Sequence, residues 1–205
     1  MAPMENTLDP RQTALLVADM QCSVVEGFAF DKGVVQRLAR MVEECRREGV
    51  PIFYVKVLRR ADGKDAPPVV TDAGLRAAAL GQARGIILTE GAPEAEILPE
   101  LAPQPGDYVI VKRRVSCFYG TPLELFLRSR GIDTLMMGGI ATNMVIESTV
   151  RDGRDRDFNM VVLEDCCSAA TREAHNAALV SLALFARVMT SQEALEKLRQ
   201  PVRQR

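Results

Sequence analysis

Tryptophan is absent from this sequence of 205 residues, histidine occurs once, and aromatic residues make up only 5% of the chain. A single imidazole cannot supply the two or more histidines that many catalytic zinc sites use. The lone histidine, His175, stands in the helical pattern TREAHNAAL, and we interpret it as a residue of a helix face or of the packing. We therefore expect no metal and no other cofactor.

The sequence also lacks long apolar runs, a disulfide pattern and an excess of charge of one sign. Its apolar stretches have the length of strands and stay below the ~20 residues of a membrane span. Five cysteines without a repeated CxxC spacing argue against a disulfide framework or a zinc knuckle, and a net charge of -1 gives no reason to expect nucleic acid or an anionic membrane as a partner. We expect a cytoplasmic protein with reduced thiols that acts on a small molecule.

Apolar runs rich in branched residues alternate with amphipathic helical patterns along the chain. The expected strands are TALLVADM at 13–20, VPIFYVKVL at 50–58, DYVIVK at 107–112, DTLMMGG at 133–139, NMVVLED at 159–165 and RVMT at 187–190. Helices are expected at 34–48, 121–130, 143–155, 171–186 and 191–199. This alternation predicts an α/β protein with a three-layer Rossmann-like fold: a six-stranded, mainly parallel sheet with helices on both faces. We expect residues 1–205 to form one domain.

The segment from residue 59 to residue 105 is the irregular part of the pattern and contains six prolines. An insertion of this length in a compact domain is more often functional than a simple connection. We expect it to cover a substrate or to contact another subunit.

Ligands of such sheets bind outside the carboxyl ends of the strands, and three polar features arrive there. Asp19 ends the first expected strand, Lys112 ends the third, and the Gly139–Asn143 turn follows the fourth. Each has an ordinary structural interpretation as a turn former, a solvated strand end or a connection. Their placement on one edge favours a catalytic pair, because an Asp–Lys pair in a closed pocket tunes the proton affinity of both groups.

The stretch GGIATNMVIESTVRD, residues 138–152, has the form of a catalytic turn without a nucleophilic residue. A glycine pair ends a strand, and a Thr-Asn pair opens a helix whose first N–H groups could lower a thiol pKa or hold an oxyanion. A nucleophile would be expected at the helix start, yet the residues there are Met144, Val145 and Ile146.

Three ordered motifs resemble those of the isochorismatase-like hydrolases, also called the cysteine hydrolase superfamily. They are LLVADMQ at 15–21, PGDYVIVKRRVSCFYGTPLE at 105–124 and GGIATNMVIESTVRD at 138–152, and VVLEDCCSA at 161–169 resembles the strand and turn that follow. The resemblance covers about residues 10 to 195. It implies that Asp19 and Lys112 are catalytic and that the family's nucleophilic cysteine position is occupied by Val145.

The resemblance further implies that the turn of Ile140, Ala141, Thr142 and Asn143 serves as the oxyanion site and that the Ile140–Ala141 peptide is cis. Substrate contacts are expected from Gln21, Phe28, Arg114, Cys117 and Phe118. Relatives of this kind also lead us to expect a homodimer or a homotetramer.

Three functions stay open without a thiol at position 145. Isochorismatases proper lack that cysteine and hydrolyse a vinyl ether, with the aspartate as general acid, so a thiol-independent Asp/Lys hydrolase acting on a small polar metabolite is the first hypothesis. The second is a non-catalytic ligand-binding homologue. The third is an amidohydrolase with a relocated nucleophile such as Cys117. Vicinal Cys166 and Cys167 are interpreted as packing residues.

Overall fold

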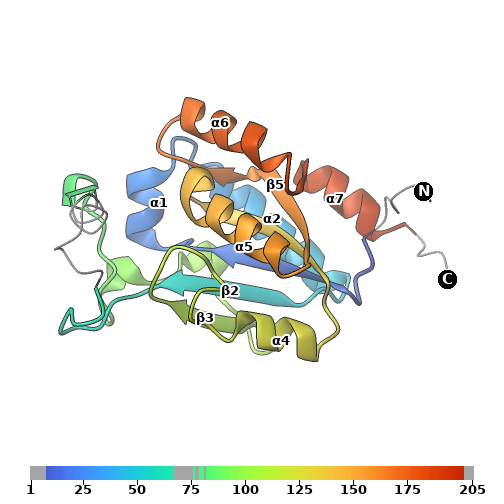
Figure 1. Cartoon of the computed structure of the whole chain (residues 1–205), viewed down its shortest axis with the longest axis horizontal. Helices are drawn as coiled ribbons and strands as arrows, with labels where there is room; N and C mark the ends of the chain where they lie inside the picture. The colour runs from blue at the N-terminus through green and yellow to red at the C-terminus, as the bar shows by residue number, and fades with distance from the viewer. Residues whose placement is uncertain (1–7, 67–75, 77–78, 81, 201–205) are drawn as a thin grey trace.

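The computed structural model describes residues 8–66, 76, 79–80 and 82–200 (Figure 1). The strands are β1 (Thr13–Ala18), β2 (Ile52–Val57), β3 (Tyr108–Lys112), β4 (Thr134–Ile140), β5 (Asn159–Ser168) and β6 (Arg187–Met189). The helices are α1 (Cys22–Phe28), α2 (Val34–Arg47), α4 (Leu123–Ser129), α5 (Glu147–Asp155), α6 (Arg172–Leu182) and α7 (Ser191–Leu198). Shorter helical turns are η1 (Pro93–Ala95), η2 (Pro99–Leu101) and the π-helical η3 (Thr142–Ile146).

The six strands form one sheet in the order β3-β2-β1-β4-β5-β6, and every neighbouring pair is parallel. The chain reverses its direction of travel across the sheet between β1 and β4, so the carboxyl ends of these two strands flank the topological switch point. Ligands of open α/β sheets bind at such a point. The expected α/β fold with a six-stranded sheet is confirmed.

Helices cover both faces of the sheet, as Figure 1 shows. Side chains of α1, α2 and α7 pack on the face that carries Leu15 and Val17 of β1. The opposite face, with Leu16 and Ala18, packs against α4, α5 and α6. Because β1 is buried on both faces, its sequence is a continuous apolar run rather than an alternating one.

The boundaries differ from the sequence expectations in places that matter for the site. Strand β1 ends at Ala18, and Asp19 is the first residue after it. The helix expected at 143–155 is two elements, the π-helical η3 and then α5. Helix α4 begins at Leu123, after Pro122, and Thr121 Oγ1 accepts from the Leu123 N–H at 3.3 Å. The short α1 was not expected, because seven residues carry too little periodicity to show a helix.

The glycine pair at the end of β4 is explained by close packing against β1. Gly139 has φ 142°, and a Cβ atom there would come within 2.0 Å of the Ala18 carbonyl oxygen. A side chain is therefore excluded at this position. The absence of one lets the end of β4 approach the end of β1 beside Asp19.

Candidate active site

Asp19 lies directly after β1 in a left-handed backbone conformation that residues other than glycine rarely adopt. Its φ is 51°. Its N–H donates to the Val55 carbonyl at 2.9 Å, which ties it to the end of the neighbouring strand β2. The chain thus turns out of the strand while the carboxylate stays buried, with its side chain 7% exposed.

Lys112, the last residue of β3, reaches Asp19 across the end of β2. Its Nζ lies 2.8 Å from Asp19 Oδ2 and donates to the Arg114 carbonyl at 3.0 Å. The lysine side chain is 2% exposed, so this is a buried ion pair. The two residues are 93 positions apart in sequence, and the parallel sheet joins them because all its strands end at one edge.

The second carboxylate oxygen of Asp19 is buried and accepts no hydrogen bond from any described residue. The nearby Val57 N–H is donated to Gln21 Oε1 at 2.9 Å. Burial raises the pKa of Asp19 above its ordinary value, although the charge and the hydrogen bond of Lys112 oppose the rise. Burial and the ion pair with Lys112 therefore act in opposite directions on the proton affinity of this carboxyl group, and its Oδ1 takes no part in the ion pair.

The turn after β4 stands beside this pair. The Ile140–Ala141 peptide is cis, as the resemblance implied. Ala141 is the N-cap residue of η3, and its carbonyl accepts from the N–H groups of Met144 at 3.1 Å and Ile146 at 3.4 Å. Val145 lies between those two donors in sequence and is a buried apolar residue that is 2% exposed.

Thr142 anchors the turn to two other elements. Its Oγ1 lies 3.0 Å from the Ser168 carbonyl at the end of β5 and 2.8 Å from Nδ1 of His175 on α6. The hydroxyl proton goes to the carbonyl, so Nδ1 carries the hydrogen and donates to Thr142. Burial and the charge of Arg172 lower the pKa of His175. The histidine is thus a hydrogen-bonded support of the turn in addition to the packing residue that its sequence position indicated.

A cavity of about 200 Å³ joins these groups. Its lining contains Asp19, Lys112, Val145, Ile140 and Ala141, together with Val24, Phe28, Val57, Arg59, Leu80, Ile86, Leu88, Arg113, Arg114, Val115 and Met144. Most of these side chains are apolar, and the charged ones come from the ends of β1, β2 and β3. The arrangement matches a small-molecule site with an apolar wall and a few placed polar groups.

The family model described as the isochorismatase domain matches residues 13–193 of the sequence, which is most of the chain. The protein belongs to the isochorismatase family. It is 35% identical over 203 residues to the uncharacterised isochorismatase family protein YecD of Escherichia coli O157:H7, a match that covers 93% of this chain and 98% of that one. It is 34% identical to the ureidoacrylate amidohydrolase RutB of Methylobacterium radiotolerans, over 89% of this chain and 78% of that one.

The fold of this isochorismatase-family hydrolase is also close to that of solved relatives. A cysteine hydrolase from Pseudomonas syringae pv. phaseolicola superposes with a TM-score of 0.82 at 26% identity, and the alignment covers 94% of each chain. None of the described helices is long and apolar enough to cross a membrane. Within the described residues there is no cluster of three or more His, Cys, Asp or Glu side chains that could hold a metal ion.

Two of the five expected substrate-contacting residues, Phe28 and Arg114, line the pocket of this isochorismatase-family site. Gln21 does not, because its amide is used within the protein. Its Nε2 donates to the Val57 carbonyl at 2.9 Å and the Ala95 carbonyl at 2.6 Å, and its Oε1 accepts from the Val57 N–H. Gln21 instead joins the residues after β1 to β2 and η1.

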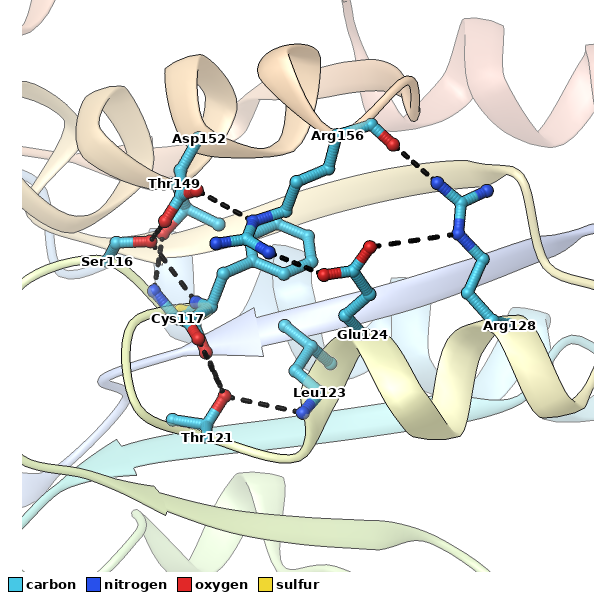
Figure 2. A network of polar contacts seen from close by, with 10 residues as sticks. Ser116, Cys117, Thr121, Leu123, Glu124, Arg128, Thr149, Asp152 and Arg156 are labelled. Carbon is cyan, nitrogen blue, oxygen red and sulfur yellow. Dashed lines mark hydrogen bonds and ion pairs between the residues drawn. The ribbon is translucent and has the colours of Figure 1, made fainter.

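Cys117 and Phe118 also lie outside the pocket lining, in the packing between β3, α4 and α5. The Cys117 N–H donates to Thr149 Oγ1 at 3.0 Å, and Ser116 Oγ donates to Asp152 at 2.7 Å (Figure 2). Phe118 stacks on Phe158 at 5.5 Å between ring centroids. These contacts hold the loop after β3 against α5 and so fix its position relative to Lys112.

The thiols of the buried cysteines are poor nucleophiles. Burial raises the pKa of Cys117, Cys45 and Cys167 to about 12, and it raises that of Cys166 as well. Cys166 and Cys167 lie within β5 and pack on opposite faces of the sheet, in agreement with their interpretation as packing residues. Cys22 is partly exposed and lines a separate depression of about 560 Å³ between α1, α2 and residues 84–100, which contains neither Asp19 nor Lys112.

No sequence pattern predicted the pocket residues that come from the 59–105 segment. Arg59 pairs with Thr89 in an isolated parallel bridge, and this bridge brings Ile86 and Leu88 over the end of β2. The described part of the segment thus covers the pocket, which is one of the two roles expected for it. A contact that depends on one isolated β-bridge has no regular spacing in the sequence that could predict it.

Proposed function

We propose that this isochorismatase-family hydrolase acts without a covalent thiol intermediate, with Asp19 as general acid and base and Lys112 as its counter-charge. The single observation that carries the proposal is the buried Asp19–Lys112 pair, whose free carboxylate oxygen shares a pocket with a valine at the nucleophile position. Val145 cannot form a thioester, so water must add to the substrate directly.

Hydrolysis of a vinyl ether fits these groups. Protonated Asp19 donates its proton to the enol ether carbon, and the electron pair of the double bond forms the new C–H bond, which leaves an oxocarbenium ion. Water adds to the cationic carbon and returns a proton to Asp19. The resulting hemiketal breaks its C–O bond to give a ketone and an alcohol. The raised pKa of Asp19 supports the first step, and Lys112 stabilises the carboxylate that this step leaves behind.

The turn of Ile140, Ala141, Thr142 and Asn143 contributes backbone dipoles in the same proposal. The first N–H groups of a helical turn have no partner within it and favour negative charge nearby. Thr142 and His175 hold this turn in place, as described above. The turn therefore serves to orient a polar group of the substrate against Asp19.

Turnover in H₂¹⁸O with a panel of small vinyl ethers, amides and ureido compounds tests the proposal by mass spectrometry. We expect one ¹⁸O atom per turnover, in the ketone formed from a vinyl ether and not in the alcohol, no inhibition by iodoacetamide, and a loss of turnover of about 10²–10⁴-fold in Asp19→Asn. Asp155→Asn, the same change at an exposed position of α5, is the matched control.

Two other results would assign the site differently. Inhibition that follows the alkylation of Cys117 would establish an amidohydrolase with a relocated nucleophile. Ligand binding without turnover of any compound in the panel would establish the non-catalytic homologue, which the buried Val145 favours.

A further inference from the structure

The pocket carries an excess of positive charge that its own residues do not neutralise. Asp19 and Lys112 form a pair, and Arg113 is paired with Asp65 at 2.8 Å and Glu90 at 2.6 Å. Arg59 and Arg114 also line the cavity, and no carboxylate of the described residues lies within ion-pair distance of either. Two guanidinium groups thus remain available to a ligand.

Arg114 is held in place by neutral partners, so its positive charge is not compensated by them. Its Nη1 donates to two backbone carbonyls, those of Asp65 at 3.1 Å and Arg113 at 2.8 Å. Its own carbonyl accepts from Lys112 Nζ at 3.0 Å. Neutral acceptors hold the guanidinium in place, and one hydrogen bond separates the residue from the reactive pair.

Arg59 is fixed through its backbone rather than its side chain. Its N–H donates to the Leu88 carbonyl at 2.7 Å, and its carbonyl accepts from the Glu90 N–H at 2.9 Å. Its guanidinium makes no hydrogen bond within the described part of the chain. The residue therefore enters the pocket from the isolated bridge with Thr89, and none of the five guanidinium donors has a partner among the described residues.

The rest of the lining is apolar, and the cavity is small. Val24, Phe28, Ile86, Leu88 and Met144 contribute side chains to it. A volume of about 200 Å³ corresponds to roughly seven water molecules of liquid volume and lies below the range of drug-sized sites.

We propose that the site selects a small monoanionic substrate, a carboxylate with a compact apolar body, and that Arg59 and Arg114 bind the carboxylate. Arginine suits this role because its planar guanidinium donates two parallel hydrogen bonds to a carboxylate. With the carboxylate at Arg114, the apolar body lies against the wall that leads to Asp19 and the turn. This inference rests on the proposed function for the identity of the site, but the binding it describes does not need turnover.

Isothermal titration with three probes of one shape tests the charge selection: benzoate, benzamide and benzylammonium. We expect benzoate to bind at least about tenfold more tightly than benzamide, and benzylammonium to bind most weakly, because a hydrogen bond to a charged group contributes about 1.5–3 kcal/mol. Acetate should bind more weakly than benzoate, since it lacks the apolar body. Equal affinity for benzoate and benzamide, a preference for benzylammonium, or no binding of any probe would overturn the inference.

Three variants assign the selection to residues. Arg59→Gln and Arg114→Gln should each weaken benzoate binding about tenfold or more and leave benzamide binding unchanged. Arg154→Gln removes the same charge from an exposed position of α5 and should leave both affinities unchanged. Benzoate binding that survives both pocket substitutions refutes the role of the arginines.

Titration of Asp19→Asn separates this inference from the proposed function. Benzoate selectivity retained in Asp19→Asn, together with no hydrolysis of any compound by the unsubstituted protein in the ¹⁸O assay, would support the anion site and refute the hydrolase mechanism. Hydrolysis of neutral compounds only, without selectivity for benzoate, would support the hydrolase mechanism and refute the anion site.

Discussion

Replacing Val145 by cysteine introduces the residue that the family resemblance predicts at this position, and the reactivity of the new thiol tests whether the turn stabilises negative charge. Val145 is 2% exposed and lines the cavity beside Asp19 and Lys112. Valine and cysteine are similar in volume, so we expect a cost in the free energy of unfolding below ~1.5 kcal/mol. The new thiol should fold into the same site.

The reactivity of that thiol is set by two opposing effects. At Cys117, which is wholly buried nearby, burial raises the thiol pKa from 9.0 to about 12 even though Lys112 opposes the rise. A helix start returns up to ~2 kcal/mol to a thiolate in favourable, partly buried geometry. Position 145 also faces the cavity, whereas Cys117 does not, so the desolvation there is smaller.

We therefore expect the introduced thiol to react with iodoacetamide faster than a free peptide thiol at pH 7, with a pH–rate midpoint below 8.5. Peptide mass spectrometry over time gives the rate for each cysteine separately. The measurement is best made with Cys22→Ser in the background, because Cys22 is the partly exposed native thiol. All four remaining cysteines should stay unreacted over the same period.

Val150→Cys is the matched control for this experiment. Val150 is fully buried on α5, in the same hydrophobic cluster, and does not line the cavity. Its thiol should behave like Cys117 and resist alkylation. If the thiol at position 145 is as inert as the one at position 150, the turn no longer stabilises negative charge, and the non-catalytic function becomes the better explanation.

Three other substitutions give independent checks by urea unfolding. Lys112→Met should lower the free energy of unfolding by about 3–5 kcal/mol at neutral pH, because it leaves the Asp19 carboxylate buried without its counter-charge. The difference should shrink toward pH 4, since burial raises the pKa of Asp19 and the buried carboxyl group is tolerated once it is protonated. The double variant Asp19→Asn/Lys112→Met should recover much of the lost stability. Gly139→Ala should lower the free energy of unfolding by more than ~4 kcal/mol or prevent folding, because its Cβ would collide with the backbone of β1. Gly91→Ala, which has open space around its Cβ, should lower it by about 1 kcal/mol. Thr142→Val should cost about 1–3 kcal/mol, because two buried polar groups lose their partner; a loss within experimental error would mean that water replaces the hydroxyl.

The fold and the central pair were accessible from sequence because they depend on strong local patterns. Each buried strand is an apolar run rich in branched residues, and the parallel sheet then places all strand ends at one edge. Asp19 and Lys112 could be assigned to that edge without knowledge of any contact. The parallel topology converted two distant positions into neighbours.

The remainder of the site depends on contacts without a sequence period. Gln21 follows Asp19 by two positions, as a substrate-binding residue could, yet its amide is used by the backbone of β2 and η1. Cys117 follows Lys112 by five positions, but the loop turns it toward α5. Arg59 enters the pocket through one isolated bridge. Such placements are decided by where single hydrogen bonds form.

The identity of residue 145 bears on the carboxylate oxygen of Asp19 that has no donor among the described residues. A thiol at that position could donate a hydrogen bond to the carboxylate, and a valine cannot. A buried acceptor without a donor costs about 1–3 kcal/mol, and the protein could have avoided this cost with an asparagine or an apolar residue at position 19. We expect a ligand that binds beside Asp19 to donate a hydrogen bond to this oxygen. A protonated Asp19 satisfies the same requirement from its own side, because it becomes the donor. In the proposed mechanism, Asp19 therefore acts by proton transfer.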